Sequence, residues 1–289
     1  MTTHTLEVDG ADIVYDVEGP LPTADGRPPL VLIGQPMEAR GFKTLVSFFP
    51  DRTVVTYDPR GIGRSVRKDG RVDHSPTVQA ADVHAVIGAV GGGPVDLFGS
   101  SGGSVTALAL VAAYPDDVHT LVAHEPTLIR VLPDAEGSER AFGDVIDAYQ
   151  ARGAGAGMAA FMAMTMWRGE FNDEYFSRPA PDPAQFGMPA QDDGSRDDPL
   201  FSGRSAAVAN YRPDAGALAA APTRVVIAVG EESEGVFTGR TSKAPAELLG
   251  QETTVFPSHH GGFAGGEFGY TGQPEAFARR LHEVLDGHD

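Results

Sequence analysis

The sequence predicts an α/β protein with a mostly parallel sheet of eight strands, helices on both faces of that sheet, and an inserted helical cap. Two patterns predict this architecture. Apolar runs of strand length alternate with segments of helical spacing over most of the 289 residues, which is typical of βαβ units. Between residues 131 and 215 the alternation stops, and helical and Pro-rich segments follow one another without a strand. We therefore expect a core formed by residues 1–130 and 216–289 and a cap formed by residues 131–215.

The amino-terminal segment predicts an antiparallel hairpin that leads into parallel strands. Residues 4–19 (HTLEVDGADIVYDVEG) alternate apolar and polar residues on both sides of Asp9-Gly10. The runs at 29–34 and 53–58 are continuously apolar, as expected of strands that are buried on both faces. Residues 41–49, between these runs, have apolar side chains at helical spacing.

The rest of the core continues this pattern. Ser75 is expected to cap a helix that has Pro76 in its first position and ends at the glycines that follow Val90. Further strands are predicted at residues 95–99, 120–125, 224–230 and 253–257. The last predicted helix, residues 274–285, carries its apolar side chains on one face.

The predicted cap contains two helical stretches and a loose loop. Residues 140–153 have helical spacing, and residues 158–171 (MAAFMAMTMWRGEF) are rich in Met and aromatic side chains. Residues 178–200 are rich in Pro, Gly and Asp, so we expect a turn-rich loop there. Its acidic run, residues 192–198, is expected to be solvated, and we predict no metal site.

Composition excludes several functional classes. The chain is 41% hydrophobic and 21% charged, which is ordinary for a globular protein. A formal charge of −18 argues against nucleic acid and anionic membranes as partners, because both would repel it. The absence of cysteine excludes disulfides and a thiolate nucleophile. No signal-peptide pattern and no 18-residue apolar run is visible, so we expect a cytoplasmic protein, either a monomer or a homodimer.

Residues 99–103 (Gly-Ser-Ser-Gly-Gly) lie between a predicted strand and a predicted helix and match the pattern Gly-x-Ser-x-Gly, centred on Ser101. A nucleophile that stands clear of a sheet sits on a sharp, strained turn, where the positions two residues away have no room for a large side chain. Ser100 does not fit, because Phe98 stands two residues before it. The following helix directs its amino-terminal N–H groups at the same place. We therefore predict that Ser101 is a nucleophile.

With this motif the chain resembles the α/β-hydrolase fold superfamily, in particular its capped, lipase/esterase-like group. Residues 58–65 (DPRGIGRS) resemble a loop of this group with the pattern D-x-R-G-x-G-x-S, and the likeness implies that Asp58 and Arg60 hold that loop. The glycines in this loop do not predict a dinucleotide site, because no helix opens after them. The resemblance implies a Ser, acid, His order along the chain and chemistry without a cofactor.

The resemblance locates the base in the loop after the last strand. That loop, residues 257–263 (PSHHGGF), offers His259 and His260. In this group the catalytic His is usually followed by Gly or an apolar residue. This pattern selects His260, which precedes Gly261. His260 would accept the Ser101 proton and return it to the leaving group.

The acid of the triad has more than one candidate. Most relatives carry it three residues beyond a glycine that ends the strand after the cap, and here Gly230 leads to Ser233, which has no charge. Glu231 and Glu232 are neighbours of that position. Glu125 lies at the end of the strand that follows the elbow helix, where some relatives place the acid. We favour Glu125 and keep Glu232 as the main alternative.

An oxyanion hole and an apolar pocket complete the predicted site. By the same likeness, the backbone N–H groups of Gly102 and Gln35 are the expected oxyanion donors. The Met- and aromatic-rich cap predicts an apolar chamber above Ser101. The expected lining residues are Gly34, Met37, Ser100, Phe161, Met164, Trp167 and Gly261.

These features predict a serine hydrolase that cleaves a carboxylic ester, thioester or lactone of a small hydrophobic substrate through an acyl-enzyme. The same triad also serves C–C bond hydrolysis, amide or iminopeptide cleavage and cofactor-free peroxidation, and no residue in the sequence separates these. A ligand-binding protein on the same scaffold, without catalysis, is a further alternative.

Overall fold

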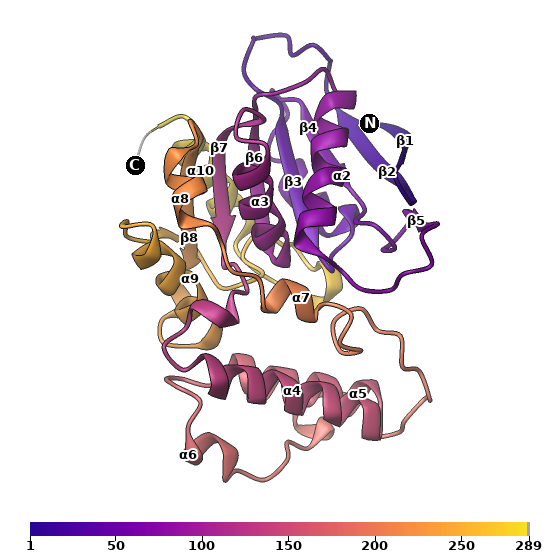
Figure 1. Ribbon diagram of the computed structural model, residues 1–289, viewed down its shortest axis with the longest axis vertical. Helices are drawn as coiled ribbons and strands as arrows, with labels where there is room; N and C mark the ends of the chain where they lie inside the picture. Colours follow the sequence, from indigo (N-terminus) through magenta and orange to yellow (C-terminus); the bar gives the residue numbers. More distant parts are fainter. Residues whose placement is uncertain (288–289) are drawn as a thin grey trace.

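The computed structural model describes residues 1–287, and within them a nine-stranded sheet forms the centre of the molecule (Figure 1). The strands are β1 (Thr2–Val8), β2 (Ala11–Glu18), β3 (Leu30–Gln35), β4 (Val54–Tyr57), β5 (Val66–Arg67), β6 (Val95–Ser101), β7 (Val118–His124), β8 (Arg224–Gly230) and β9 (Thr254–Phe256). Eight of them follow the order β1-β2-β4-β3-β6-β7-β8-β9, and the short β5 pairs with β2. The predicted α/β fold is therefore confirmed, with β5 as an addition.

The direction of the strands changes where the hairpin meets the core. β1 and β2 are antiparallel around the Asp9-Gly10 turn, and β2 also runs antiparallel to β4. From β4 to β9, each neighbouring pair of strands is parallel. The carboxyl ends of the parallel strands therefore meet at one edge of the sheet, which is where such folds hold their ligands.

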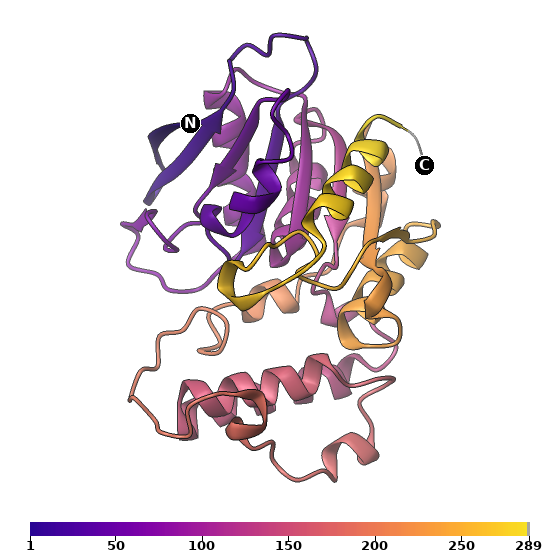
Figure 2. The ribbon, with the colours of Figure 1, turned by 180° about the vertical axis from the view of Figure 1, so that it is seen from behind.

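Helices cover both faces of the sheet (Figures 1 and 2). One face carries α2 (Pro76–Ala89), α3 (Gly102–Ala113) and α8 (Ala215–Ala220), and the other carries α1 (Lys43–Val46) and α10 (Pro274–Leu285). Successive side chains of a strand point to opposite faces. Val31 of β3 accordingly belongs to the apolar cluster under α2 and α3, whereas Leu30 and Leu32 belong to the cluster under α1 and α10.

One predicted helix has the expected length and another is much shorter. α2 starts at Pro76 and ends before the glycines, as expected; Ser75 occupies the N-cap position, but its side chain makes no capping hydrogen bond. The stretch 41–49 forms only a 3-10 turn, η1 (Ala39–Phe42), followed by the single-turn α1, with Phe42 and Leu45 fully buried. α9 (Phe237–Leu248) packs beside β8, and two further 3-10 turns are η4 (Glu231–Ser233) and η5 (Glu267–Gly269).

A helical layer lies across the carboxyl ends of the parallel strands (Figures 1 and 2). It consists of η2 (Ile129–Val131), α4 (Ala135–Arg152), α5 (Ala154–Thr165), α6 (Asp173–Phe176), η3 (Pro183–Phe186) and α7 (Ala206–Ala209). Its own apolar cluster includes Phe142 and Tyr149 of α4 and Met164 of α5. Phe237 of α9 belongs to the same cluster, so the cap packs on the core through α9. No helix within residues 1–287 has the length and apolar character needed to cross a membrane.

Candidate active site

Ser101 occupies a strained turn between β6 and α3. Its backbone has φ 57° and ψ −125°, outside the regions that non-glycine residues favour. The glycines two residues before and two after it have no room for a side chain: a Cβ on Gly99 would lie 2.8 Å from the Cα of Ser104, and one on Gly103 would lie 2.3 Å from the carbonyl oxygen of Ile33. The crowding that the Gly-x-Ser-x-Gly spacing predicts is therefore present on both sides of the turn.

Buried ion pairs hold the loop that follows β4. The carboxylate of Asp58 accepts hydrogen bonds from the backbone N–H groups of Ala39 and Arg64, both at 2.8 Å. The guanidinium of Arg60 donates two bonds to Asp82, at 2.9 and 2.6 Å. Asp58 thereby ties its own loop to the segment that follows β3, which agrees with the scaffold role implied by the resemblance.

The half-buried His260 and the buried Glu125 form a hydrogen-bonded pair at the same edge of the sheet. The Nδ1 atom of His260 lies 2.7 Å from Glu125 Oε2, and the other carboxylate oxygen accepts the N–H of Gly230 at 2.9 Å. Glu125 is fully buried and adopts φ 48° directly after β7. A Nδ1–H that is engaged by a carboxylate leaves Nε2 of the ring as the proton acceptor.

The environment of Glu125 favours its charged form. Burial alone would raise the pKa of this carboxyl, but the hydrogen bond and charge of His260 outweigh burial and lower the pKa well below its usual range. The Ser233 hydroxyl, at the position where most relatives carry the acid, adds a smaller lowering contribution through its hydrogen bond to Glu125. The alternative acids point elsewhere: Glu231 accepts the N–H of Ser258 at 3.0 Å, and Glu232 is exposed.

The sheet register brings Ser101 and Glu125 to neighbouring strand ends. The β6–β7 ladder pairs Ser100 with His124, one residue before each of them. In the described chain, however, the Ser101 hydroxyl bonds to the hydroxyl of Thr127 at 3.0 Å, and residues 1–287 contain no hydrogen bond between Ser101 and His260. Thr127 is thus a hydrogen-bond partner of Ser101 that sequence reasoning did not identify.

The predicted oxyanion residues also lie at this edge. Gln35 ends β3 and is paired with Ser101 in the β3–β6 ladder, and Gly102 opens α3. The buried side chain of Gln35 accepts a hydrogen bond from Gln79 at 3.0 Å, and Gln79 in turn accepts one from Thr106 at 3.1 Å. This supporting chain from α2 and α3 was not visible in the sequence pattern.

His124 is a second histidine near the pair, and its early place in chain order argues against a role as the base. Its side chain is fully buried, its ring centroid lies 6.3 Å from that of His260, and neither ring nitrogen has a hydrogen-bond partner in residues 1–287. Phe98, Phe256 and Phe277 surround it. Burial lowers the pKa of His124 to about 4, so the ring is neutral at pH 7.

A small apolar chamber lies over Ser101. Its volume is about 40 Å³, and it is lined by Phe142, Phe161 and Met164 of the cap and Phe237 of α9, together with Gln35 and Thr127. Phe161 and Met164 were predicted to line it. The lining contains no charged side chain.

The other residues that were predicted to line the pocket lie outside this chamber. Gly34 contacts Met37 at the end of β3, Ser100 is buried within β6, and Gly261 packs against Tyr270. Trp167 lines a separate cavity within the cap. Residues 1–287 contain no group of three or more His, Asp or Glu side chains that could hold a metal ion.

Comparison with known proteins agrees with this fold. The family model for the alpha/beta hydrolase fold matches residues 37–153. A Bacillus subtilis protein named as an uncharacterized hydrolase, YraK, is 27% identical over 289 residues, which covers 98% of this chain and 95% of that protein. The sheet topology and these matches show that the chain has the alpha/beta hydrolase fold.

Two solved esterases share the fold over their whole length. The esterase EaEST from Exiguobacterium antarcticum superposes with a TM-score of 0.68 at 19% identity, over 99% of this chain and 100% of that one. The esterase RhEst1 from Rhodococcus sp. superposes with a TM-score of 0.67 at 20% identity, over 100% of both chains.

Proposed function

We propose that this protein is a serine hydrolase that cleaves a carboxylic ester, thioester or lactone of a small hydrophobic substrate. The observation that carries the proposal is the pairing of a strained Ser101 turn at the start of α3 with a His260–Glu125 hydrogen bond of 2.7 Å at the neighbouring strand end. The esterase activity named for two structures of the same fold supports the substrate class.

In the proposed reaction, Ser101 Oγ attacks the carbonyl carbon of the substrate while its proton passes to Nε2 of His260. The tetrahedral intermediate collapses, the C–O or C–S bond breaks, and the proton moves from His260 to the leaving alkoxide or thiolate. Water then repeats the sequence on the acyl-enzyme and releases the acid. The ionised Glu125 holds the ring tautomer and stabilises the imidazolium that forms in both steps.

Two features of the resting site must change before this attack. The Ser101 hydroxyl has to leave its hydrogen bond with Thr127 and donate its proton to His260. A chamber of about 40 Å³ holds little more than one water molecule, so Phe161 and Met164 of the cap must move to admit a substrate. Such rearrangements of a cap are common in enzymes that close over their substrates.

The developing oxyanion would lie near the start of α3, where the helix directs its positive dipole end. The backbone N–H groups of Gly102 and Gln35 are the proposed donors. The uncharged lining of the chamber supports a hydrophobic acyl group rather than a charged one.

Ser101→Ala tests the proposal directly. We expect turnover of p-nitrophenyl butyrate to fall by about 10⁴-fold or more, because the covalent step is lost, with the unfolding midpoint little changed. A fluorophosphonate should label the wild-type protein once, at Ser101, as read by peptide mass spectrometry. Ser100→Ala, one residue away, is the matched control and should keep activity. A folded Ser101→Ala protein with wild-type turnover would contradict the proposal.

A panel of aryl esters, lactones and aminoacyl amides identifies the bond that is cleaved.

A further inference from the structure

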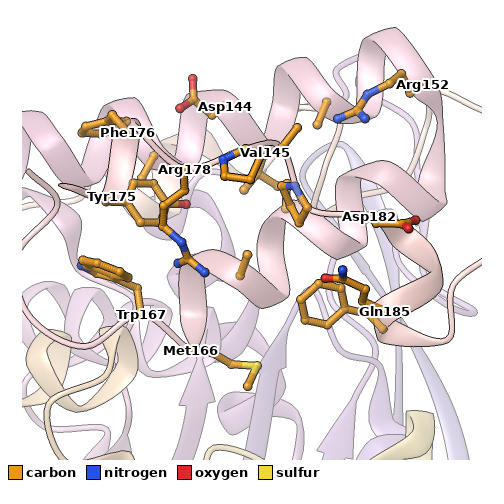
Figure 3. Close-up of a pocket in the computed structure, with 18 residues that line it drawn as sticks. Asp144, Val145, Arg152, Met166, Trp167, Tyr175, Phe176, Arg178, Asp182 and Gln185 are labelled. Carbon is orange, nitrogen blue, oxygen red and sulfur yellow. The ribbon is translucent and has the colours of Figure 1, made fainter. Parts of the chain in front are cut away.

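A large cavity lies within the cap and away from Ser101. It has a volume of about 730 Å³, and its lining comes from residues 141–186 (Figure 3). α4 and α5 form one side, and the segment from α6 to η3 forms the other. Binding sites for small molecules commonly have volumes of about 300–1,000 Å³, so the cavity is of ligand size.

The α4–α5 pair separates this cavity from the chamber over Ser101. Phe142 and Phe161 line the Ser101 chamber, whereas Ala141, Val145 and Ala160 of the same two helices line the cap cavity. The two linings have no residue in common. The cap cavity is therefore a separate compartment on the far side of the two helices.

The walls of the cap cavity combine aromatic rings with two guanidinium groups, those of Arg152 and Arg178, and Arg178 is the one beside the aromatic ring of Trp167. Alanines of α4 and α5 form a smooth floor, and Trp167, Tyr175 and Phe176 form an aromatic wall. Arg178 lies with its guanidinium carbon 5.2 Å from the Trp167 ring centroid, and Figure 3 shows the group extending among the lining side chains. No carboxylate of residues 1–287 forms an ion pair with Arg178, although the chain carries 40 acidic residues.

The two acidic side chains of the cavity wall do not neutralise Arg178. Asp182 accepts the N–H of Ala184 at 3.0 Å and so caps η3. Asp144 interacts with the charge of Arg140, one turn earlier on α4, and Figure 3 shows its carboxylate directed away from Arg178. An unpaired guanidinium beside aromatic rings favours a ligand with an apolar body and a carboxylate head.

We propose that the cap cavity is a second binding site, which takes a hydrophobic carboxylate with its apolar part against Trp167 and the alanine floor and its head on Arg178. This proposal does not depend on catalysis by Ser101. The site would let an organic acid stabilise one arrangement of α4 and α5, the helices whose opposite side covers Ser101.

The single tryptophan of the chain makes the test specific. Trp167 is the only tryptophan, so its emission reports on this cavity alone. We would titrate Ser101→Ala protein, which removes any acyl chemistry, with octanoate, octan-1-ol and octylammonium. We expect a saturable change of emission with octanoate at a lower concentration than with the other two probes. A preference for octanol or octylammonium, or no saturable binding, would overturn the proposal.

Two variants locate the ligand. Arg178→Gln should raise the octanoate concentration for half-saturation about tenfold or more, because a charge-assisted hydrogen bond is lost, and calorimetry gives the same constant without tryptophan. Arg196→Gln is the matched control, since Arg196 is in the cap but pairs with Asp192 outside the cavity. Ala163→Phe should block binding by filling the floor. Unchanged octanoate binding in Arg178→Gln would refute the assignment whatever the outcome of the Ser101 experiments.

Discussion

The two cavities on either side of α4 and α5 differ in size, in charge and in the part of the chain that builds them. The chamber over Ser101 measures about 40 Å³, has no charged side chain in its lining, and combines strand ends of the core with cap side chains. The cap cavity measures about 730 Å³, includes four charged side chains, and is built by a single stretch of sequence. The comparison indicates that the geometry around Ser101 is set by a closely packed backbone, whereas the binding properties of the cap cavity are set by the side chains that line it.

The largest effect on the Ser101 side is expected from Glu125→Gln. The variant keeps the shape of the buried side chain but removes the charge that orients and stabilises the His260 ring. Loss of the acid in comparable triads costs about 10³–10⁴-fold in kcat, and we expect a loss of that size with an ester substrate.

Glu232→Gln is the matched control for Glu125→Gln. Glu232 was the alternative acid, and its exposed position predicts an activity within about twofold of wild type. A large loss of kcat in Glu232→Gln, with Glu125→Gln active, would contradict the geometry on which the proposed triad rests.

A second experiment compares backbone crowding beside Ser101 with backbone crowding in the cap helix α4. In Gly103→Ala the new Cβ would lie 2.3 Å from a backbone oxygen of β3, and backbone cannot move aside cheaply, so we expect the free energy of unfolding to fall by about 3 kcal/mol or more. In Gly143→Ala, on α4, the new Cβ meets nothing within 4 Å, and we expect a gain of about 0.5–1 kcal/mol from helix propensity. Urea unfolding of both variants measures the two changes in unfolding free energy. Equal changes would contradict the difference in backbone crowding between the two positions.

A third experiment uses the protonation of the buried His124 beside the His260–Glu125 pair. The pKa of His124 is about 4 in the folded protein, compared with an ordinary value of 6.5, because burial disfavours the protonated ring. His124 is therefore protonated below about pH 6.5 in the unfolded chain but only below about pH 4 in the folded chain. The resulting stabilisation is complete above pH 6.5 and is lost as the pH falls towards 4.

His124→Phe should remove this dependence while keeping an aromatic ring among Phe98, Phe256 and Phe277. We expect the variant to gain about 1–2 kcal/mol of unfolding free energy relative to wild type between pH 7 and pH 5. The difference in unfolding free energy between variant and wild type at pH 7 reports the effect on packing. The change of that difference with pH reports the protonation of His124. A difference that stays constant over this range would show that His124 is not the group involved.

Local rules made the fold and the strained turn at Ser101 predictable. The Gly-x-Ser-x-Gly spacing is read within five residues, because the steric demand it reflects lies within a single turn, and the Ser101 φ of 57° fits it. Strand runs and helix caps likewise gave the order of the core elements. The acid was left open, because Glu125 and Glu232 both follow strands and only the fold determines which of them reaches His260.

The remaining features depend on contacts between distant segments. Thr127 is 26 residues from Ser101, and Gln79 supports Gln35 across 44 residues, so neither partner has a local signal. The cap cavity arises where α6 and η3 pack on α4 and α5, which periodicity within each helix does not determine. Trp167 was expected above Ser101 because it belongs to the Met- and aromatic-rich stretch of the cap. It lines the opposite side of the cap helices instead.

The smallest expected effect concerns the hydrogen bond between the hydroxyl groups of Ser101 and Thr127. Thr127→Val keeps the shape of the side chain but removes the hydroxyl that lies 3.0 Å from Ser101 Oγ. A hydrogen bond between neutral groups contributes about 1 kcal/mol, so its loss should free the Ser101 hydroxyl for His260 and raise the rate of fluorophosphonate labelling about threefold to fivefold. Thr127→Ser retains the hydroxyl and should label at the wild-type rate. Slower labelling of Thr127→Val would reverse the role of this contact, because it would mean that Thr127 holds Ser101 in its reactive orientation rather than away from it.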